Sequence, residues 1–240
     1  MAGQFSMKRI LTGCIVILFM LLSVNIQAKE VNAMVENIHW FGHDTFRIVG
    51  RDVTVFTDPF RLKRAHKADI ILITHEHYDH CSPEDVGKVQ SDDTVIVTTP
   101  DCAAKLSGNI RTVKPGDRLE VKGVEIEVVP AYNTNKQFHP RAKNWVGYIF
   151  KLDGKRIYLA GDTDYIPEMK TFKDIDIALL PVSGTYVMTA DEAVQAALDI
   201  KPKVAIPMHY GSIVGSAADA ERFADALKGK IEVVILKKEE

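Results

Sequence analysis

Short apolar runs separated by polar turns recur along most of this chain, and their length and branched side chains are typical of buried strands. Asp153-Gly154 lies between two of these runs and predicts a hairpin. Further short β elements are expected around the glycine-containing turn of 38–48 and within 109–130. The remaining strands are expected at residues 53–57, 70–73, 95–99, 146–150, 156–160, 175–180, 204–208 and 231–236.

Helix-starting signals lie between these strands. Ser82 stands before a proline and two acidic residues, which is typical of a helix cap and first turn. Thr189 and Glu192 have the spacing of a capping box. Two more helices are expected over 101–106, with its first residue Asp101 as the cap, and over 216–227. Strands that alternate with covering helices favour a layered α/β fold.

The strongest chemical signal follows the apolar run at 70–73, where residues 75–80 read His-Glu-His-Tyr-Asp-His. In an extended segment His75 and His77 point to the same side, and Asp79 and His80 follow where the chain can turn. Imidazole nitrogen and carboxylate oxygen are ligands for zinc, iron or manganese. The alternative is a solvated polar loop, which leaves four such ligands within six residues unexplained. We therefore predict a metal site.

Three more candidates follow other predicted strands: Asp58, Asp162 and His209. Ligand sites in open α/β sheets gather outside the carboxyl ends of the strands, so these side chains are expected near the histidine-rich segment. His139 lies in a loop and is a fourth candidate. Taken singly, each has a structural alternative, because aspartate is common in turns and a loop histidine can simply be exposed.

Residues 75–80 match the His-x-His-x-Asp-His signature of metallo-β-lactamase-fold hydrolases, which the chain therefore resembles. The resemblance implies a four-layer αββα sandwich over about residues 36–240. It also implies two metal ions with these ligands: His75, His77 and His139 for the first, Asp79, His80 and His209 for the second, and Asp162 as a bridge between them.

Two ions so held would share a hydroxide, and this nucleophile would act near neutral pH. Zinc is the default for a histidine-rich site, while carboxylate ligands also admit manganese or iron. Asp79 is thereby placed at the catalytic centre, and Asp58 is expected to orient a ligand histidine. The role of Glu76 is left open.

Residues 40–46 resemble the Gly-His-x-x-Phe segment of one branch of this superfamily, through Gly42, His43 and Phe46. That branch includes ascorbate-6-phosphate lactonases and N-acylphosphatidylethanolamine phospholipase D. The resemblance places His43 near the metals as a catalytic residue that orients a ligand or donates a proton to the leaving group. A histidine packed beside a turn is the structural alternative.

The first 28 residues differ from the rest of the chain. A basic start at Lys8-Arg9, an apolar run over 10–24 and a small residue at Ala28 form the layout of a secretory signal. The domain 29–240 is then expected to be periplasmic or secreted, and an uncleaved run would instead anchor it to a membrane. Residues 29–36 are expected to be a linker or leading edge.

The chain has 240 residues, 46% of them hydrophobic, so one large domain is expected after the signal. A net charge of −2 gives no electrostatic case for binding nucleic acid. Cys81 and Cys102 could pair in an oxidising compartment, but sequence alone leaves this open. Cys81 directly follows His80 and could instead be a metal ligand, and a buried bystander thiol is favoured over that role. A homo-oligomer is left open.

The expected activity is hydrolysis of a small-molecule substrate, namely an ester, a lactone or a phosphodiester. Lys136, Arg141 and Lys143 around His139 could hold an anionic group, although basic loop residues are usually solvated. Two alternatives remain. One is a membrane-anchored lipid phosphodiesterase, and the other is a metal-binding protein without turnover.

Overall fold

The structure is a computed structural model that describes residues 29–240. The first half of the chain forms a six-stranded sheet whose strand order equals the chain order. Its first three strands pair antiparallel, and the third to sixth pair parallel. The strands are β1 (Ile38–Gly42), β2 (Thr45–Val49), β3 (Thr54–Thr57), β4 (Ile70–Leu72), β5 (Val95–Thr98) and β6 (Asn109–Thr112).

The second half forms a seven-stranded sheet in the order β13-β12-β11-β10-β9-β8-β7. Strands β7 to β10 pair antiparallel, and β10 to β13 pair parallel. The strands are β7 (Arg118–Val121), β8 (Val124–Pro130), β9 (Val146–Leu152), β10 (Lys155–Leu159), β11 (Ile177–Pro181), β12 (Val204–Met208) and β13 (Glu232–Val233).

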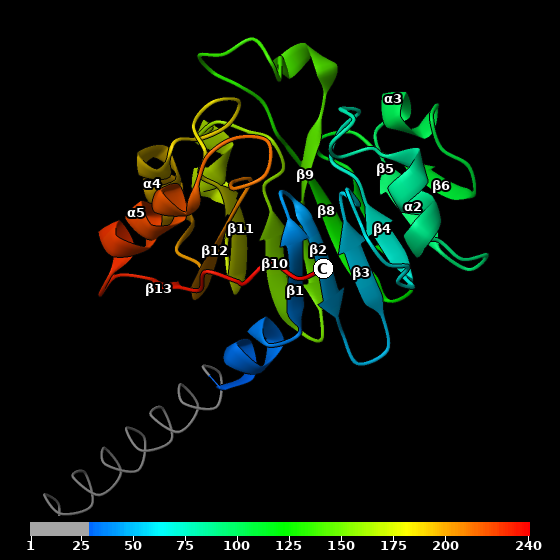
Figure 1. The fold of residues 1–240 in the computed structure, drawn as a ribbon, viewed down its shortest axis with the longest axis horizontal. Coiled ribbons are helices and arrows are strands. Elements are labelled where there is room, and N and C mark those ends of the chain that lie inside the picture. Colours follow the sequence, from blue (N-terminus) through cyan, green and yellow to red (C-terminus); the bar gives the residue numbers. More distant parts are fainter. Residues whose placement is uncertain (1–28) are drawn as a thin grey trace, which may run out of the picture.

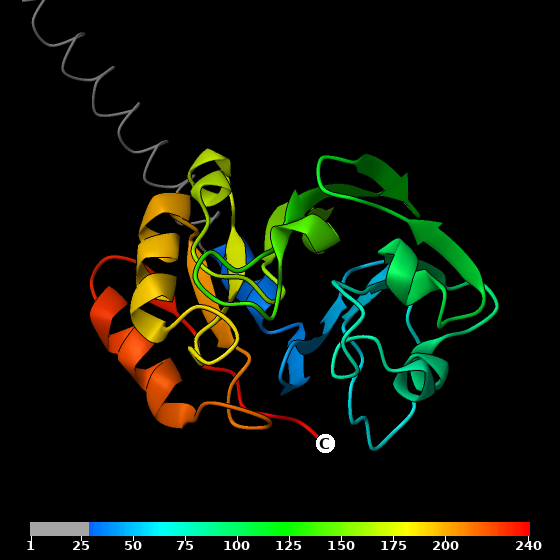
Figure 2. The ribbon, with the colours of Figure 1, turned by 90° about the horizontal axis from the view of Figure 1, so that it is seen from above.

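Helices cover the outer sides of the two sheets. Figure 1 shows α4 and α5 on one flank of the molecule and α2 and α3 on the other, with the strands between them, and Figure 2 shows the same layering from above. The predicted αββα sandwich is therefore confirmed. The helices are α2 (Pro83–Val89), α3 (Pro100–Ala103), α4 (Ala190–Ile200) and α5 (Ala217–Leu227), with 3-10 turns η1 (Arg141–Lys143) and η2 (Pro167–Thr171).

The apolar run before the histidines forms β4, a strand that is buried on both faces. Ile70 and Leu72 belong to the large core between the sheets, whereas Ile71 and Ile73 belong to the smaller core beneath α2 and α3. All four are 0% exposed. Side chains alternate between the faces of a strand, so an unbroken apolar run fits a strand covered on both sides.

Two of the predicted helix starts are confirmed in detail. The Ser82 side chain accepts a hydrogen bond from the backbone N–H of Asp85, and Thr189 with Glu192 forms the expected capping box. The prediction that Asp101 caps the short helix is wrong. Thr99 is the N-cap of α3, because Pro100 already stands at a first-turn position and Asp101 lies inside the helix.

The ends of the described chain differ from expectation. Residues 29–35 are helical rather than a linker, and Val31 and Met34 are buried in the core. The last strand is two residues long, and the chain then runs beside β1, where the N–H of Glu239 donates to the carbonyl of Trp40 at 2.7 Å. This tail covers an otherwise free sheet edge.

The predicted signal or anchor, residues 1–28, lies outside the described residues. Within residues 29–240, none of the helices has the length and apolar character needed to cross a membrane.

Candidate metal centre

The carboxyl ends of four strands meet at one place in the molecule. Asp58 follows β3, Asp162 follows β10 and His209 follows β12, while the histidine-rich segment follows β4. The turn between β1 and β2 brings His43 to the same place. The strand-end arrangement expected from the sequence is therefore present, and it draws on both sheets.

A three-histidine group forms one side of the site. Ring nitrogens of His75, His77 and His139 all lie within 4.8 Å of one another, and His75 Nε2 is 3.0 Å from His77 Nδ1. The buried indole of Trp145 packs against all three rings. Burial lowers the pKa of His75 and of His77. Neutral imidazoles that converge in this way are the form that binds a metal ion.

Asp162 lies between the three-histidine group and the remaining ligand candidates. Its Oδ2 is 3.1 Å from His139 Nε2 and also 3.1 Å from His209 Nε2. Its Oδ1 is 3.4 Å from His80 Nε2. The structure thus brings the predicted bridging carboxylate within reach of histidines from both sides.

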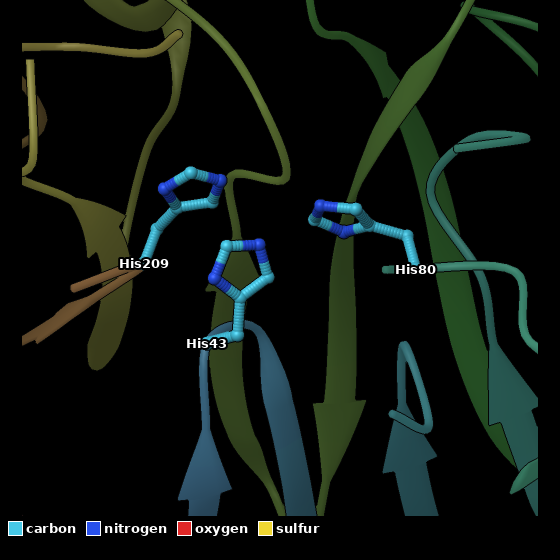
Figure 3. A group of neighbouring side chains, drawn as sticks. All are labelled: His43, His80 and His209. Atoms are coloured by element: carbon cyan, nitrogen blue, oxygen red, sulfur yellow. The ribbon is translucent and has the colours of Figure 1, made fainter. Parts of the chain in front are cut away.

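His43, His80 and His209 form a second group. Figure 3 shows the three rings turned toward a common space, with His43 rising from the β1–β2 turn between the other two. Burial lowers the pKa of His43 to about 4. Asp79 is half-buried at its edge: Oδ2 is 3.1 Å from His43 Nε2 and 3.9 Å from His80 Nε2.

Three of the candidate ligand histidines have a hydrogen-bond partner at Nδ1. His80 Nδ1 lies 2.8 Å from Asp58 Oδ2, and His209 Nδ1 lies 3.0 Å from the hydroxyl of Ser183. His139 Nδ1 lies 3.2 Å from Asn133 Oδ1. Such partners fix the tautomer and orientation of a ligand histidine, and in His80 and His139 they leave Nε2 directed at the site.

Asp58 connects two parts of the centre. Besides His80, its carboxylate accepts hydrogen bonds from the backbone N–H and the hydroxyl of Thr74, at 2.8 and 2.7 Å. Thr74 directly precedes His75, so one buried carboxylate orients both ends of the histidine-rich segment. Asp58, His43 and His209 all have positive φ, namely 34°, 53° and 58°. Left-handed backbone at non-glycine residues is costly and clusters at functional sites.

The described residues fit divalent metal ions. His80 Nε2, His139 Nε2 and Asp162 Oδ1 are buried without a hydrogen-bond partner in the described part of the chain. Buried polar atoms without partners are uncommon, and these three converge. Burial alone would raise the pKa of Asp162, but His209 and His80 hold it well below its usual range. The mixed imidazole and carboxylate donors suit zinc, manganese or iron.

Asp44 is a site residue that the sequence analysis missed. It is fully buried beside Asp162 and His209, and burial raises the pKa of its carboxyl to about 8. The available signal was its position directly after His43, but an aspartate in a turn is ordinary. Ser183 contacts His209 and Asn133 contacts His139, but no pattern in the sequence indicates either role.

A disulfide joins the histidine-rich segment to α3. Cys81, the residue after His80, bonds Cys102 with a Cα–Cα distance of 6.2 Å. The pairing that the sequence left open is therefore present, so Cys81 is not the bystander thiol that was favoured over a metal ligand. Sequence alone could not place the two Cα atoms within bonding distance.

Each basic residue near His139 is paired with an acidic residue. Lys136 lies 2.6 Å from Asp164, and Arg141 lies 3.0 Å from Glu168. Lys143 lies 2.9 Å from Glu76, which also pairs with Lys105. Lys136 and Arg141 are thus each matched by one carboxylate, whereas Glu76 is shared by two lysines.

Comparisons with known proteins identify the family of this chain. Residues 37–209 match the model of the beta-lactamase superfamily domain. A UPF0173 metal-dependent hydrolase of Thermoplasma acidophilum is 34% identical over 217 residues, covering 83% of this chain and 93% of the relative. One from Thermococcus onnurineus is 36% identical, covering 83% and 96%.

Among solved structures, a protein from Parabacteroides distasonis named as a metal-dependent hydrolase superposes with a TM-score of 0.74. It is 38% identical to this chain, and the match covers 85% of this chain and 93% of that one.

Proposed function

The chain belongs to the beta-lactamase superfamily and is a metal-dependent hydrolase, and on this premise we propose that it cleaves a small ester or lactone at a two-metal centre. The observation that carries the proposal is the position of Asp162. Its carboxylate lies between His139 and His209, so one residue can serve both halves of the centre. A site for a single ion would not require a carboxylate shared in this way.

In the proposed centre, His75, His77 and His139 hold one ion, while Asp79, His80 and His209 hold the other. Bound ions supply Lewis acidity toward the substrate carbonyl and lower the pKa of water to about 7. The chain positions these ligands through Asp58, Ser183 and Asn133. His43 positions Asp79, because its Nε2 contacts that carboxylate and its ring is 1% exposed.

The charges around the site favour a neutral substrate. Lys136, Arg141 and Lys143 are each paired with a carboxylate, so a phosphodiester would have to compete with these carboxylates for the basic groups. Of the three substrate classes expected from the sequence, the ester and the lactone therefore fit better than the phosphodiester. A lipid phosphodiesterase is the second candidate only by family resemblance.

We also propose that the protein acts outside the cytoplasm. Disulfides persist in oxidising compartments and are rare in the cytosol. The buried bond between Cys81 and Cys102 adds to the signal-like layout of the first 28 residues.

The test combines metal content with hydrolysis by the purified domain. We expect two equivalents of metal and chelator-sensitive hydrolysis of p-nitrophenyl acetate or dihydrocoumarin, with slower cleavage of bis(p-nitrophenyl) phosphate. Faster cleavage of the phosphodiester than of the ester and the lactone would show that phosphodiesters, and not esters or lactones, are the substrate class. A folded protein that bound none of zinc, manganese or iron would overturn the proposal as a whole.

A further inference from the structure

Asp44 is a buried carboxylate that the proposed chemistry does not use. It lies in the turn between β1 and β2, is 0% exposed, and has no hydrogen-bond partner for either carboxylate oxygen within residues 29–240. Burying a charged group without a partner is strongly unfavourable, and each such group in a folded protein needs an explanation.

The groups around Asp44 are already engaged with one another. The closest ring nitrogen recorded beside it, His80 Nδ1, is 4.0 Å from Asp44 Oδ2 but only 2.8 Å from Asp58. His209 Nδ1 faces Ser183, and its Nε2 faces Asp162. The nearer nitrogen of His80 and both nitrogens of His209 therefore face groups other than Asp44.

The turn that carries Asp44 is built into the centre. The carbonyl of His43 accepts hydrogen bonds from the indole N–H of Trp40 at 2.9 Å and from the backbone N–H of His209 at 3.2 Å. The carbonyl of Asp44 accepts one from the hydroxyl of Thr57 at 2.7 Å. Carboxylate oxygens of Asp44 and Asp162 and a nitrogen of His209 all lie within 4.8 Å of one another.

We propose that Asp44 is a further carboxylate ligand of the second metal site, the one with His80 and His209, and that it biases this site toward manganese or iron. The inference rests on the proposed two-metal centre. With Asp44, the second site has three carboxylates, from Asp44, Asp79 and Asp162. Oxygen donors favour manganese or iron relative to zinc, whereas the three-histidine group suits zinc.

The competing explanation is that Asp44 is a neutral acid that only fills space. Asparagine has nearly the same shape as a protonated aspartate, so Asp44→Asn would then change neither metal content nor metal preference. If Asp44 is a ligand, the same variant removes an anionic donor and weakens one ion selectively. Asp44→Ser removes the carboxylate and shortens the side chain, and it gives a second test should the asparagine amide bind a metal ion.

The experiment measures metal binding without any substrate. Apoprotein is titrated with Mn²⁺ alone, with Zn²⁺ alone and with an equimolar mixture, and bound metal is counted by mass spectrometry. We expect the wild type to bind two ions, and Asp44→Asn to bind the second at least tenfold more weakly. The ratio of manganese to zinc at that ion should shift at least tenfold toward zinc. Co²⁺-loaded protein should show an altered visible spectrum in the variant.

Asp176→Asn is the matched control, because Asp176 is a buried aspartate with its own partners, Lys203 and the N–H of Arg156. It should leave both ions and their ratio unchanged. Two ions bound by both Asp44 variants with wild-type affinity and ratio would overturn the inference, even if hydrolysis is established. A wild type that binds two ions but shows no hydrolysis would affect the proposed function alone, and fewer than two ions would overturn both.

Discussion

At the scale of single residues, both carboxylate oxygens of Asp162 face ring nitrogens, and these nitrogens come from segments far apart in the chain. His80 belongs to the first half, whereas His139 and His209 belong to the second. These rings hold the pKa of the Asp162 carboxyl low, so Asp162 stays an anion that can bind a metal ion. The effect of removing it should therefore reach both ions.

Asp162→Ala should lose at least one ion and reduce turnover at least a hundredfold while leaving the fold largely intact. The physical reason is that the variant removes a donor shared by two ligand sets, and the loss exceeds the 10- to 100-fold typical of a supporting residue. Metal analysis, steady-state hydrolysis and circular dichroism check these three expectations. Full hydrolysis with both ions bound would show that Asp162 is not the bridge.

His43→Ala should keep both ions but slow turnover about tenfold, because His43 contacts Asp79 and positions it. The matched control is His66→Ala, a half-buried histidine that packs against Phe41 and Phe56 and belongs to none of the candidate metal groups within residues 29–240. Rates and metal content of the two variants are compared. Loss of an ion in His43→Ala would make His43 a ligand instead.

At the scale of elements, the sequence predicted the strands that carry ligands better than the segments between them. The runs before His75 and His209 are apolar throughout, and β10 before Asp162 is apolar from Ile157 on, because both faces of the strands are covered there. The turn at Asp44 and the partners Ser183 and Asn133 were missed. Their roles depend on which loops meet in space, and turn residues look alike whether or not they face a site.

The loop after β3 is tied to α2 by Asp85. Its carboxylate accepts hydrogen bonds from the N–H groups of Arg61 and Leu62 and from Lys88. Burial would raise the pKa of Asp85, but the bonds from Lys88, Ser82 and this backbone outweigh it and lower the pKa. The pKa in the folded state is thus below that in the unfolded state.

Asp85→Asn should lower the free energy of unfolding by about 2 kcal/mol at pH 7, because hydrogen bonds to a charged acceptor are lost. A depressed carboxyl pKa stabilises the fold above its ordinary value of about 4, and this contribution is lost as the pH falls below that value. Denaturant unfolding at pH 7 and pH 3 should therefore show a smaller gap between wild type and variant at pH 3. A gap independent of pH would contradict the assignment.

At the scale of the whole molecule, the sequence predicted the fold class and the layering but did not decide the disulfide. The alternation of strands and helices and the family signature were enough for the αββα sandwich. The sequence allowed a disulfide between Cys81 and Cys102 but could not decide it, since pairing depends on Cα positions that only the assembled fold fixes.

Reduction of the disulfide, or the variant Cys102→Ser, should lower the free energy of unfolding by about 3 kcal/mol, the value expected for a closed loop of this length. For a domain of this size the melting temperature should fall by roughly 6–12 °C. Thermal scans with and without reductant measure the shift, and the Cys102→Ser variant itself should not respond to reductant. Equal melting temperatures for the oxidised and reduced wild type would show that the bond does not stabilise the domain.

The two sheets come from successive halves of the chain, and each half carries an incomplete set of ligands. Asp44, His75, His77, Asp79 and His80 belong to the first, while His139, Asp162 and His209 belong to the second. Metal ions bound where the two halves meet would link the halves, because each ion would take ligands from both. Fragments cut between β6 and β7 should therefore reassemble more tightly with metal than with chelator, so that one pair of ions both holds the molecule together and serves its chemistry.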